Sequence, residues 1–215
     1  MRREERVLEQ EVPVQEMRSL NMFIVELDKP INDTISTKSG VELYINTDYE
    51  GGEFKYRVTD GPVVATPAKY NTPVKVGDTL YFHHLVVMQG GQKLTGVENS
   101  YFVKFDPEFA VNNQAIAYKN KKGKITPLDG WSLLLPVEEE DEDDGVIEVV
   151  SLKEKLPTKG RVAFDSKHLK AHGVKKGDVV CFKQNRDYRI KIDGKEYYRT
   201  RVEDLMYVEE EVHND

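Results

Sequence analysis

Short apolar runs recur along the chain and are separated by Gly, Pro, Asn and Asp. Runs that are rich in β-branched and aromatic residues and bounded by turn formers are typical of β-strands. Helical spacing is confined to residues 2–10, where a short helix would have to end before Pro13. The pattern therefore predicts an all-β protein. Strands are expected at residues 21–27, 63–65, 79–82, 101–105, 115–118, 131–135, 160–164, 179–182, 188–192, 196–200 and 205–208.

One stretch occurs twice. Val-Lys-x-Gly-Asp is found at residues 74–78 and again at 174–178, and each copy precedes an apolar strand. The Gly can take the positive φ that a tight turn needs, and the Asp can hydrogen-bond the local backbone. Three further pairs keep the same order, namely 23–27 with 131–135, 40–43 with 145–149, and 61–65 with 160–164. The repeat predicts two similar small antiparallel β-barrels in tandem.

The basic, apolar-poor segment 119–124 is the best candidate for a linker between the two barrels. A chain of 215 residues is long enough for two domains of about 100 residues each. We expect an N-terminal extension at residues 1–18, a first barrel at 19–119 and a second at 126–209.

Composition excludes several classes of protein. The chain is 39% hydrophobic and 32% charged, and no apolar run approaches the roughly 20 residues of a membrane span. Its single cysteine, Cys181, excludes an intrachain disulfide and fits a cytoplasmic protein in a reducing compartment. The net charge of −7 argues against a general nucleic-acid binder.

Candidate catalytic and metal-binding residues are few. The adjacent histidines His83 and His84 would face opposite ways on a strand, and His168 and His172 would suit a metal only on a helix. Cys181 occupies an apolar strand position and is expected to be a core thiol. With no phosphate loop or nucleophile elbow, the sequence predicts no enzyme, no cofactor and no metal site.

Two charged stretches have alternative interpretations. The acidic residues 138–144 could bind calcium, but they lack the ligand spacing and turn Gly of an EF-hand loop, so a solvated loop is favoured. Residues 186–201 interleave bases with tyrosines, as some nucleic-acid surfaces do. The Asp193-Gly194 turn and the intervening acids favour an ordinary β-hairpin there.

The assembled order resembles the GroES co-chaperonin family, over roughly residues 19–118 and 127–208. Pro127-Leu128-Asp129 resembles the family's start, residues 174–182 its turn and strand, and residues 203–208 its closing strand. The segment that corresponds to the family's roof hairpin is abbreviated, to residues 68–72 and 166–172, as in phage members. The resemblance implies a tandem, two-domain co-chaperonin.

The family binds its chaperonin through a mobile loop that carries a short apolar tripeptide. Residues 31–55 form the matching polar loop in the first half, and their apolar island is either a strand or a segment that pairs only when bound. Glu42 and Glu148 stand inside the two copies of the tripeptide, where the family has aliphatic residues. The chaperonin-binding residues implied are Val41, Glu42, Leu43, Val146, Ile147, Glu148 and Val149.

The implied partner is an ATP-bound, GroEL-like chaperonin ring, which the protein would cap to assist folding. Barrels of this family close a ring by pairing the terminal strands of neighbours, so a homo-oligomer is expected, with a stoichiometry that the sequence leaves open. The alternative is a ring-forming structural or viral assembly protein built from the same barrels.

Overall fold

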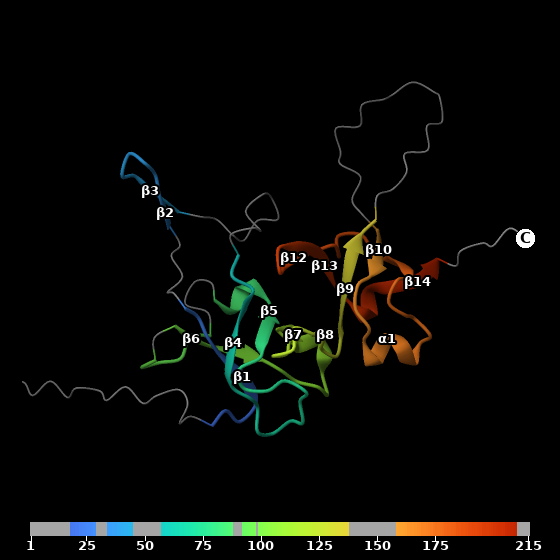
Figure 1. Ribbon diagram of the computed structural model, residues 1–215, viewed down its shortest axis with the longest axis horizontal. Coiled ribbons are helices and arrows are strands. Elements are labelled where there is room, and N and C mark those ends of the chain that lie inside the picture. Colours follow the sequence, from blue (N-terminus) through green and yellow to red (C-terminus); the bar gives the residue numbers. More distant parts are fainter. Residues whose placement is uncertain are drawn as a thin grey trace, which may run out of the picture. The chain divides into compact units, whose positions relative to one another are not determined.

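The computed structural model describes residues 18–28, 34–44, 57–87, 92–97, 99–137 and 158–209. These residues divide into two compact units, and the chain passes from the first to the second after Lys124. The described residues form two six-stranded antiparallel sheets. Figure 1 shows their strands. The predicted all-β fold is thus confirmed. The expected helix at residues 2–10 lies outside the described residues.

The first sheet has the strand order β6-β1-β4-β5-β7-β8. Its two sides meet where the Gln114 N–H, just before β7, donates to the Lys104 carbonyl at the end of β6 (3.0 Å). This bond links β6, the first strand of the order, to the start of β7, the fifth. The strands are β1 (Met22–Glu26), β4 (Asp60–Ala65), β5 (Thr79–Phe82), β6 (Ser100–Lys104), β7 (Ala115–Lys119) and β8 (Ile125–Pro127).

The second sheet has the order β12-β13-β9-β10-β11-β14. The predicted hairpin at Asp193-Gly194 joins β12 to β13, with both turn residues at positive φ. The Lys183 N–H, just after β11, donates to the Asp204 carbonyl, just before β14 (3.0 Å), and extends the pairing of these two neighbouring strands. The strands are β9 (Trp131–Pro136), β10 (Lys159–Val162), β11 (Val179–Phe182), β12 (Arg189–Ile192), β13 (Lys195–Arg201) and β14 (Leu205–Glu209).

The two sheets share one pairing scheme. The succession β6-β1-β4-β5-β7 in the first matches β13-β9-β10-β11-β14 in the second. Strand β5 pairs with the closing strand β7 of the first unit, and β11 pairs with the closing strand β14 of the second. In both pairs a bulge shifts the register just before the last residue of β5 or β11, at Phe82 and at Phe182. A β-bulge is a specific local feature, so its recurrence indicates that the two units are copies of one fold.

The repeated turn is built alike in both units. The Asp carboxylate accepts a hydrogen bond from the backbone N–H of the Lys three residues earlier, and the Gly before it has the left-handed conformation. These turns feed the central strands β5 and β11 and fix where each begins. The N···O distances are 2.9 Å for Lys75–Asp78 and 2.8 Å for Lys175–Asp178, and φ is +85° at Gly77 and +101° at Gly177.

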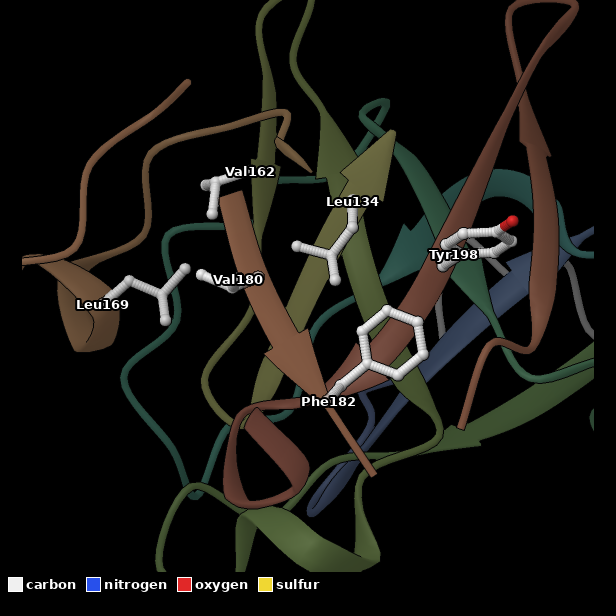
Figure 2. Close-up of a cluster of buried hydrophobic side chains, with 6 residues drawn as sticks. All are labelled: Leu134, Val162, Leu169, Val180, Phe182 and Tyr198. Carbon is white, nitrogen blue, oxygen red and sulfur yellow. The ribbon is translucent and has the colours of Figure 1, made fainter. Parts of the chain in front are cut away.

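The core of the second unit includes a residue from a short helix. Helix α1 (Lys167–Ala171) begins at Ser166, whose Oγ accepts the Leu169 N–H (3.1 Å). Figure 2 shows Leu169 directed at Val162 and Val180 of the sheet. The sequence analysis did not predict this helix, because a single turn is too short to show helical spacing and its only signal is the Ser cap. The cluster comprises Leu134, Val162, Leu169, Val180, Phe182 and Tyr198.

The segment predicted as a linker forms a tight turn between β7 and β8, two neighbouring strands of the first sheet. Asn120 Oδ1 accepts the N–H groups of Lys122 and Lys124, each at 3.0 Å. The Asn120 N–H donates in turn to the Lys124 carbonyl (3.0 Å). The basic residues are therefore held on a hairpin, and strand β8 follows where the sequence analysis expected none.

Candidate functional site

A small separate hairpin lies in the connection between β1 and β4. Its strands are β2 (Thr34–Ser36) and β3 (Glu42–Tyr44), which pair antiparallel (Figure 1). The register sets Thr34 opposite Tyr44, Ile35 opposite Leu43, and Ser36 opposite Glu42. The loop that the sequence analysis left open between a strand and an unpaired segment therefore contains a two-stranded ladder.

The turn of this hairpin is held by Thr37. Its N–H donates to the Val41 carbonyl (2.9 Å), and its Oγ1 lies 3.0 Å from the Val41 nitrogen, which donates to it. The Gly40 N–H donates to the Thr37 carbonyl (2.9 Å), and Gly40 has φ +80° with no atom within 4 Å of where a Cβ would be. Ser39 Oγ lies 2.9 Å from Thr37 Oγ1. These bonds hold the tip of the loop in a defined shape.

The predicted contact residues of the first loop lie at this turn and on β3. Val41 ends the turn and is 54% exposed, which is high for an aliphatic side chain with two methyl groups. Glu42 and Leu43 follow as the first two residues of β3. The structure therefore brings Val41, Glu42 and Leu43 together as one extended stretch at the tip of the hairpin.

The second predicted cluster lies outside the described residues. Val146, Ile147, Glu148 and Val149 fall in the connection between β9 and β10, of which the structure describes only the two ends. The contribution of this loop stays a prediction.

Ile35 was not singled out by the sequence analysis. It lies in β2 at the register position of Leu43. The signal that marks it is the turn sequence Lys38-Ser39-Gly40 between two runs that contain β-branched residues, which is typical of a hairpin.

The histidines lie at the ends of two elements, the strand β5 and the helix α1. His83 and His84 are beyond the end of β5, not on a strand, and their rings stack with centroids 4.6 Å apart. His83 Nδ1 accepts the Leu85 N–H (3.2 Å) and begins a short 3-10 helix. His168 and His172 do lie on or beside α1, with ring centroids 5.3 Å apart. No group of three metal-ligating side chains occurs within the ranges that the structure describes.

Cys181 is a buried core thiol, as predicted, and it belongs to a polar cluster across three strands. Its Sγ lies 3.7 Å from Glu209 Oε1, and Glu209 also pairs with Lys159. The hydrogen bond to Glu209 raises the pKa of Lys159, and the contact with Cys181 raises the pKa of Tyr207. These groups join β10, β11 and β14, so the cluster supports the strand pairing.

The basic and aromatic residues of the second unit pack on each other. The Arg201 guanidinium lies 3.6 Å from the centre of the Trp131 ring, and Arg199 lies 5.0 Å from that of Tyr188. Such stacking uses the aromatic faces within the barrel itself. The segment 186–201 forms the β12–β13 hairpin that was favoured for it.

Comparison with known proteins concerns mainly the second unit. The family model described as chaperonin 10 Kd subunit matches residues 124–208. A co-chaperonin GroES of Solidesulfovibrio magneticus is 34% identical over 93 residues, which cover 40% of this chain and 96% of that protein. The chain belongs to the chaperonin 10 family. Proteins of this family are not enzymes, and the chain accordingly has a non-enzymatic role.

The chaperonin 10 fold extends to the first unit through its pairing scheme. The family model begins at residue 124, yet the first sheet has the strand order and the bulge of the second. The hairpin β2–β3 lies between β1 and β4, and residues 137–158 lie between the corresponding strands β9 and β10. The two loops therefore occupy equivalent places in two chaperonin 10 barrels.

The closing strands differ in their neighbours. In the first sheet, β8 pairs with the outer edge of β7. In the second sheet, β14 is the last strand of the order within the described residues, and Met206 and Tyr207 on it are more than half exposed. An edge strand of this kind offers backbone groups to a further strand.

No described helix is long and apolar enough to cross a membrane.

Proposed function

We propose that this protein is a co-chaperonin that caps an ATP-bound chaperonin ring and assists protein folding. Its membership of the chaperonin 10 family supports the role. The observation that carries the proposal is the hairpin β2–β3, which holds an exposed Val41 at its tip, in the position of the family's mobile loop. The contact would be made by Val41, Glu42 and Leu43 with the apolar groove of the ring.

The physical case rests on alternation along the strand. Residues 41 and 43 lie on one face of an extended segment and residue 42 on the other, so the glutamate can stay in water while two aliphatics are buried. Burying an aliphatic side chain contributes about 1.5–3 kcal/mol at most. A single loop would therefore bind weakly, and a ring that presents several loops together would bind tightly. Weak individual contacts also suit a lid that must be released.

Assembly would follow from the open edge of β14. Three residues separate the end of β8 from the start of β9. The same separation from the start of β1, the counterpart of β9 in the first unit, leads to Arg18. We infer that the segment just before β1 of a neighbouring copy pairs with β14, as β8 pairs with β7. Such head-to-tail pairing closes into a ring if the rotation per copy allows it. A cytoplasmic location, as for the family in general, stays a prediction.

The test replaces the two aliphatics. The double variant Val41→Ser, Leu43→Ser should lose suppression of chaperonin ATPase while keeping the wild-type circular dichroism, because neither residue belongs to a barrel strand. Lys38→Ser, at the exposed turn, is the control and should behave as wild type. Glu42→Ile should strengthen binding. If the double variant suppresses the ATPase as well as wild type does, the first loop is not the contact.

The second loop needs its own variant. Val146→Ser, Ile147→Ser tests whether the loop of the second unit shares the contact. A loss of capping equal to that of the first-loop variant would assign a contact to each unit.

A structural assembly protein is the second candidate, because the open edge of β14 would serve ring formation without any chaperonin. Capture of the protein on an immobilised chaperonin, with and without ATP, separates the two functions. Binding that depends on ATP favours the co-chaperonin, and ring formation without chaperonin binding favours the assembly protein.

A further inference from the structure

The two histidines of the short helix α1 meet the condition that the sequence analysis set for a metal site. His168 lies within α1, and His172 is the residue that ends the helix, four positions later. Residues four apart on a helix lie on the same face. Both side chains are exposed, and their ring centres are 5.3 Å apart. The helix therefore sets two imidazoles beside each other at the surface of the second unit.

The separation of the two rings suits a shared metal ion. An imidazole nitrogen binds Zn²⁺ at about 2.0–2.1 Å, with the ion close to the plane of the ring. Two imidazoles on one tetrahedral ion therefore have ring centres about 5 Å apart. The distance of 5.3 Å between His168 and His172 is close to that value, so both rings could bind one ion with small rotations of their side chains.

The other pair of histidines lacks this geometry. The rings of His83 and His84 are stacked, with centres 4.6 Å apart and planes inclined by 24°. Because a metal ion lies close to the plane of each imidazole that binds it, rings stacked face to face cannot share one ion. His83 Nδ1 also accepts the Leu85 N–H, and His84 is buried. Chelating geometry therefore belongs to the pair on α1.

Contacts within the protein already hold α1 in place. Ser166 Oγ caps the start of the helix, and Leu169 is buried in the core of the second unit. The His172 N–H donates to the Leu169 carbonyl (3.0 Å). A pair of ligands that is held in position loses less conformational entropy on binding than two free side chains do. Lys170, between the two histidines in the sequence, is paired with Asp165 (2.9 Å), which offsets part of its positive charge.

We propose that His168 and His172 form a chelating pair for a divalent transition-metal ion such as Zn²⁺, Ni²⁺ or Cu²⁺. Imidazole suits these ions, whereas Mg²⁺ and Ca²⁺ prefer oxygen ligands. Among the described residues no third metal-ligating side chain joins the pair, so water would fill the remaining positions. Zinc proteases with two histidines at this spacing have a glutamate directly after the first one, where this chain has Leu169. The ion would therefore act as a clip across the last turn of α1.

Titration with ZnCl₂ in a calorimeter tests the site, on the full-length protein without an affinity tag. We expect one ion per chain. His168→Gln and His172→Gln should each weaken binding at least about tenfold, because a single imidazole lacks the second ligand that the helix keeps at high effective concentration. The double variant should lie within about twofold of either single one, because the two ligands act as a unit. His213→Gln changes a histidine outside both pairs and should bind like wild type.

Stability gives a second readout. A ligand that binds only the folded protein raises the free energy of unfolding. Excess Zn²⁺ should therefore raise the urea midpoint that Trp131 fluorescence reports for the second unit, and EDTA should reverse the shift. Neither His168→Gln nor His172→Gln should respond to the ion. Wild-type circular dichroism of the metal-free variants shows that their barrels are intact.

Two results would overturn the metal site. If His168→Gln or His172→Gln binds Zn²⁺ as tightly as wild type does, the pair is not a chelate. If His213→Gln abolishes binding, the ion is held elsewhere in the chain. The site is independent of the proposed co-chaperonin role, which the Val41→Ser, Leu43→Ser variant tests separately.

Discussion

At the scale of single residues, one surface carboxylate organises the connection that carries α1. Asp165 accepts a hydrogen bond from Lys170 Nζ (2.9 Å) and another from the backbone N–H of Lys176 (3.2 Å). These two bonds, that of Lys170 first, lower the pKa of Asp165 below its ordinary value of 3.8. The carboxylate thus ties the helix to the repeated turn that follows it.

The pH dependence of this tie has a definite sign. Because the folded-state pKa of Asp165 is depressed, its contribution to stability is present above pH 3.8 and is lost as the pH falls through the lower folded-state pKa. A titration of the side chain by NMR should give a midpoint below 3.8. Lys170→Gln should move that midpoint upward, and Lys167→Gln, on the same helix, should leave it in place. A midpoint at or above 3.8 in the wild type would show that the ties are absent in solution.

At the scale of elements, two glycines show how closely neighbouring strands approach. A Cβ on Gly160 of β10 would lie 2.7 Å from Leu134 Cβ on β9, too close for any real contact. A Cβ on the corresponding Gly61 of β4 would lie 3.0 Å from Leu27 Cδ2, the end of a flexible side chain. The second unit therefore requires glycine at this position more strictly than the first does.

Gly160→Ala should accordingly lower the free energy of unfolding of the second unit by about 1–3 kcal/mol. Gly61→Ala should cost the first unit less, because Leu27 can move. Trp131 is the single tryptophan and lies on β9, so its fluorescence during urea unfolding reports on the second unit. Equal costs for the two substitutions would mean that the strands relax alike in both units.

Most strands could be predicted from sequence, and the missed elements have a common cause. The strands of the barrels bury consecutive or alternating apolar residues. The turn residues Asp78 and Asp178 mark where β5 and β11 begin. Strand β8 and helix α1 span three and five residues and are too short to show a period. The position of Ile35 depends on the register of β2 and β3, which only the structure gives.

At the scale of the whole molecule, the two units have the same pairing scheme and different surroundings at their closing strands. β7 has β8 at its outer edge, and β14 ends its sheet in the part of the chain that the structure describes. The sequence predicted the duplication from the repeated turn. It did not predict the difference, because β8 spans only three residues, just after the segment that was interpreted as a linker, and no strand was expected there.

The edge of β14 leads to a test of assembly by truncation. Removal of residues 1–18 should abolish self-association, because it deletes the segment that we expect to pair with β14 of the next copy. Removal of residues 1–10 leaves that segment in place and should preserve the oligomer. Sedimentation of the two truncated proteins, with circular dichroism as the check on folding, decides the matter. An oligomer that survives both deletions would place the interface elsewhere.

The shared pairing scheme also creates a hazard within one chain, since each closing strand could in principle be exchanged for the other. The side chains oppose this exchange. Tyr81 of β5 faces Ala117 of β7, whereas Cys181 of β11 faces Tyr207 of β14, so the large and small members are reversed between the units. A swapped chain would set two tyrosines against each other in one barrel and leave a cysteine against an alanine in the other. A poorer fit between opposed side chains costs stability, so this reversal favours the correct partner when both repeats fold in one chain.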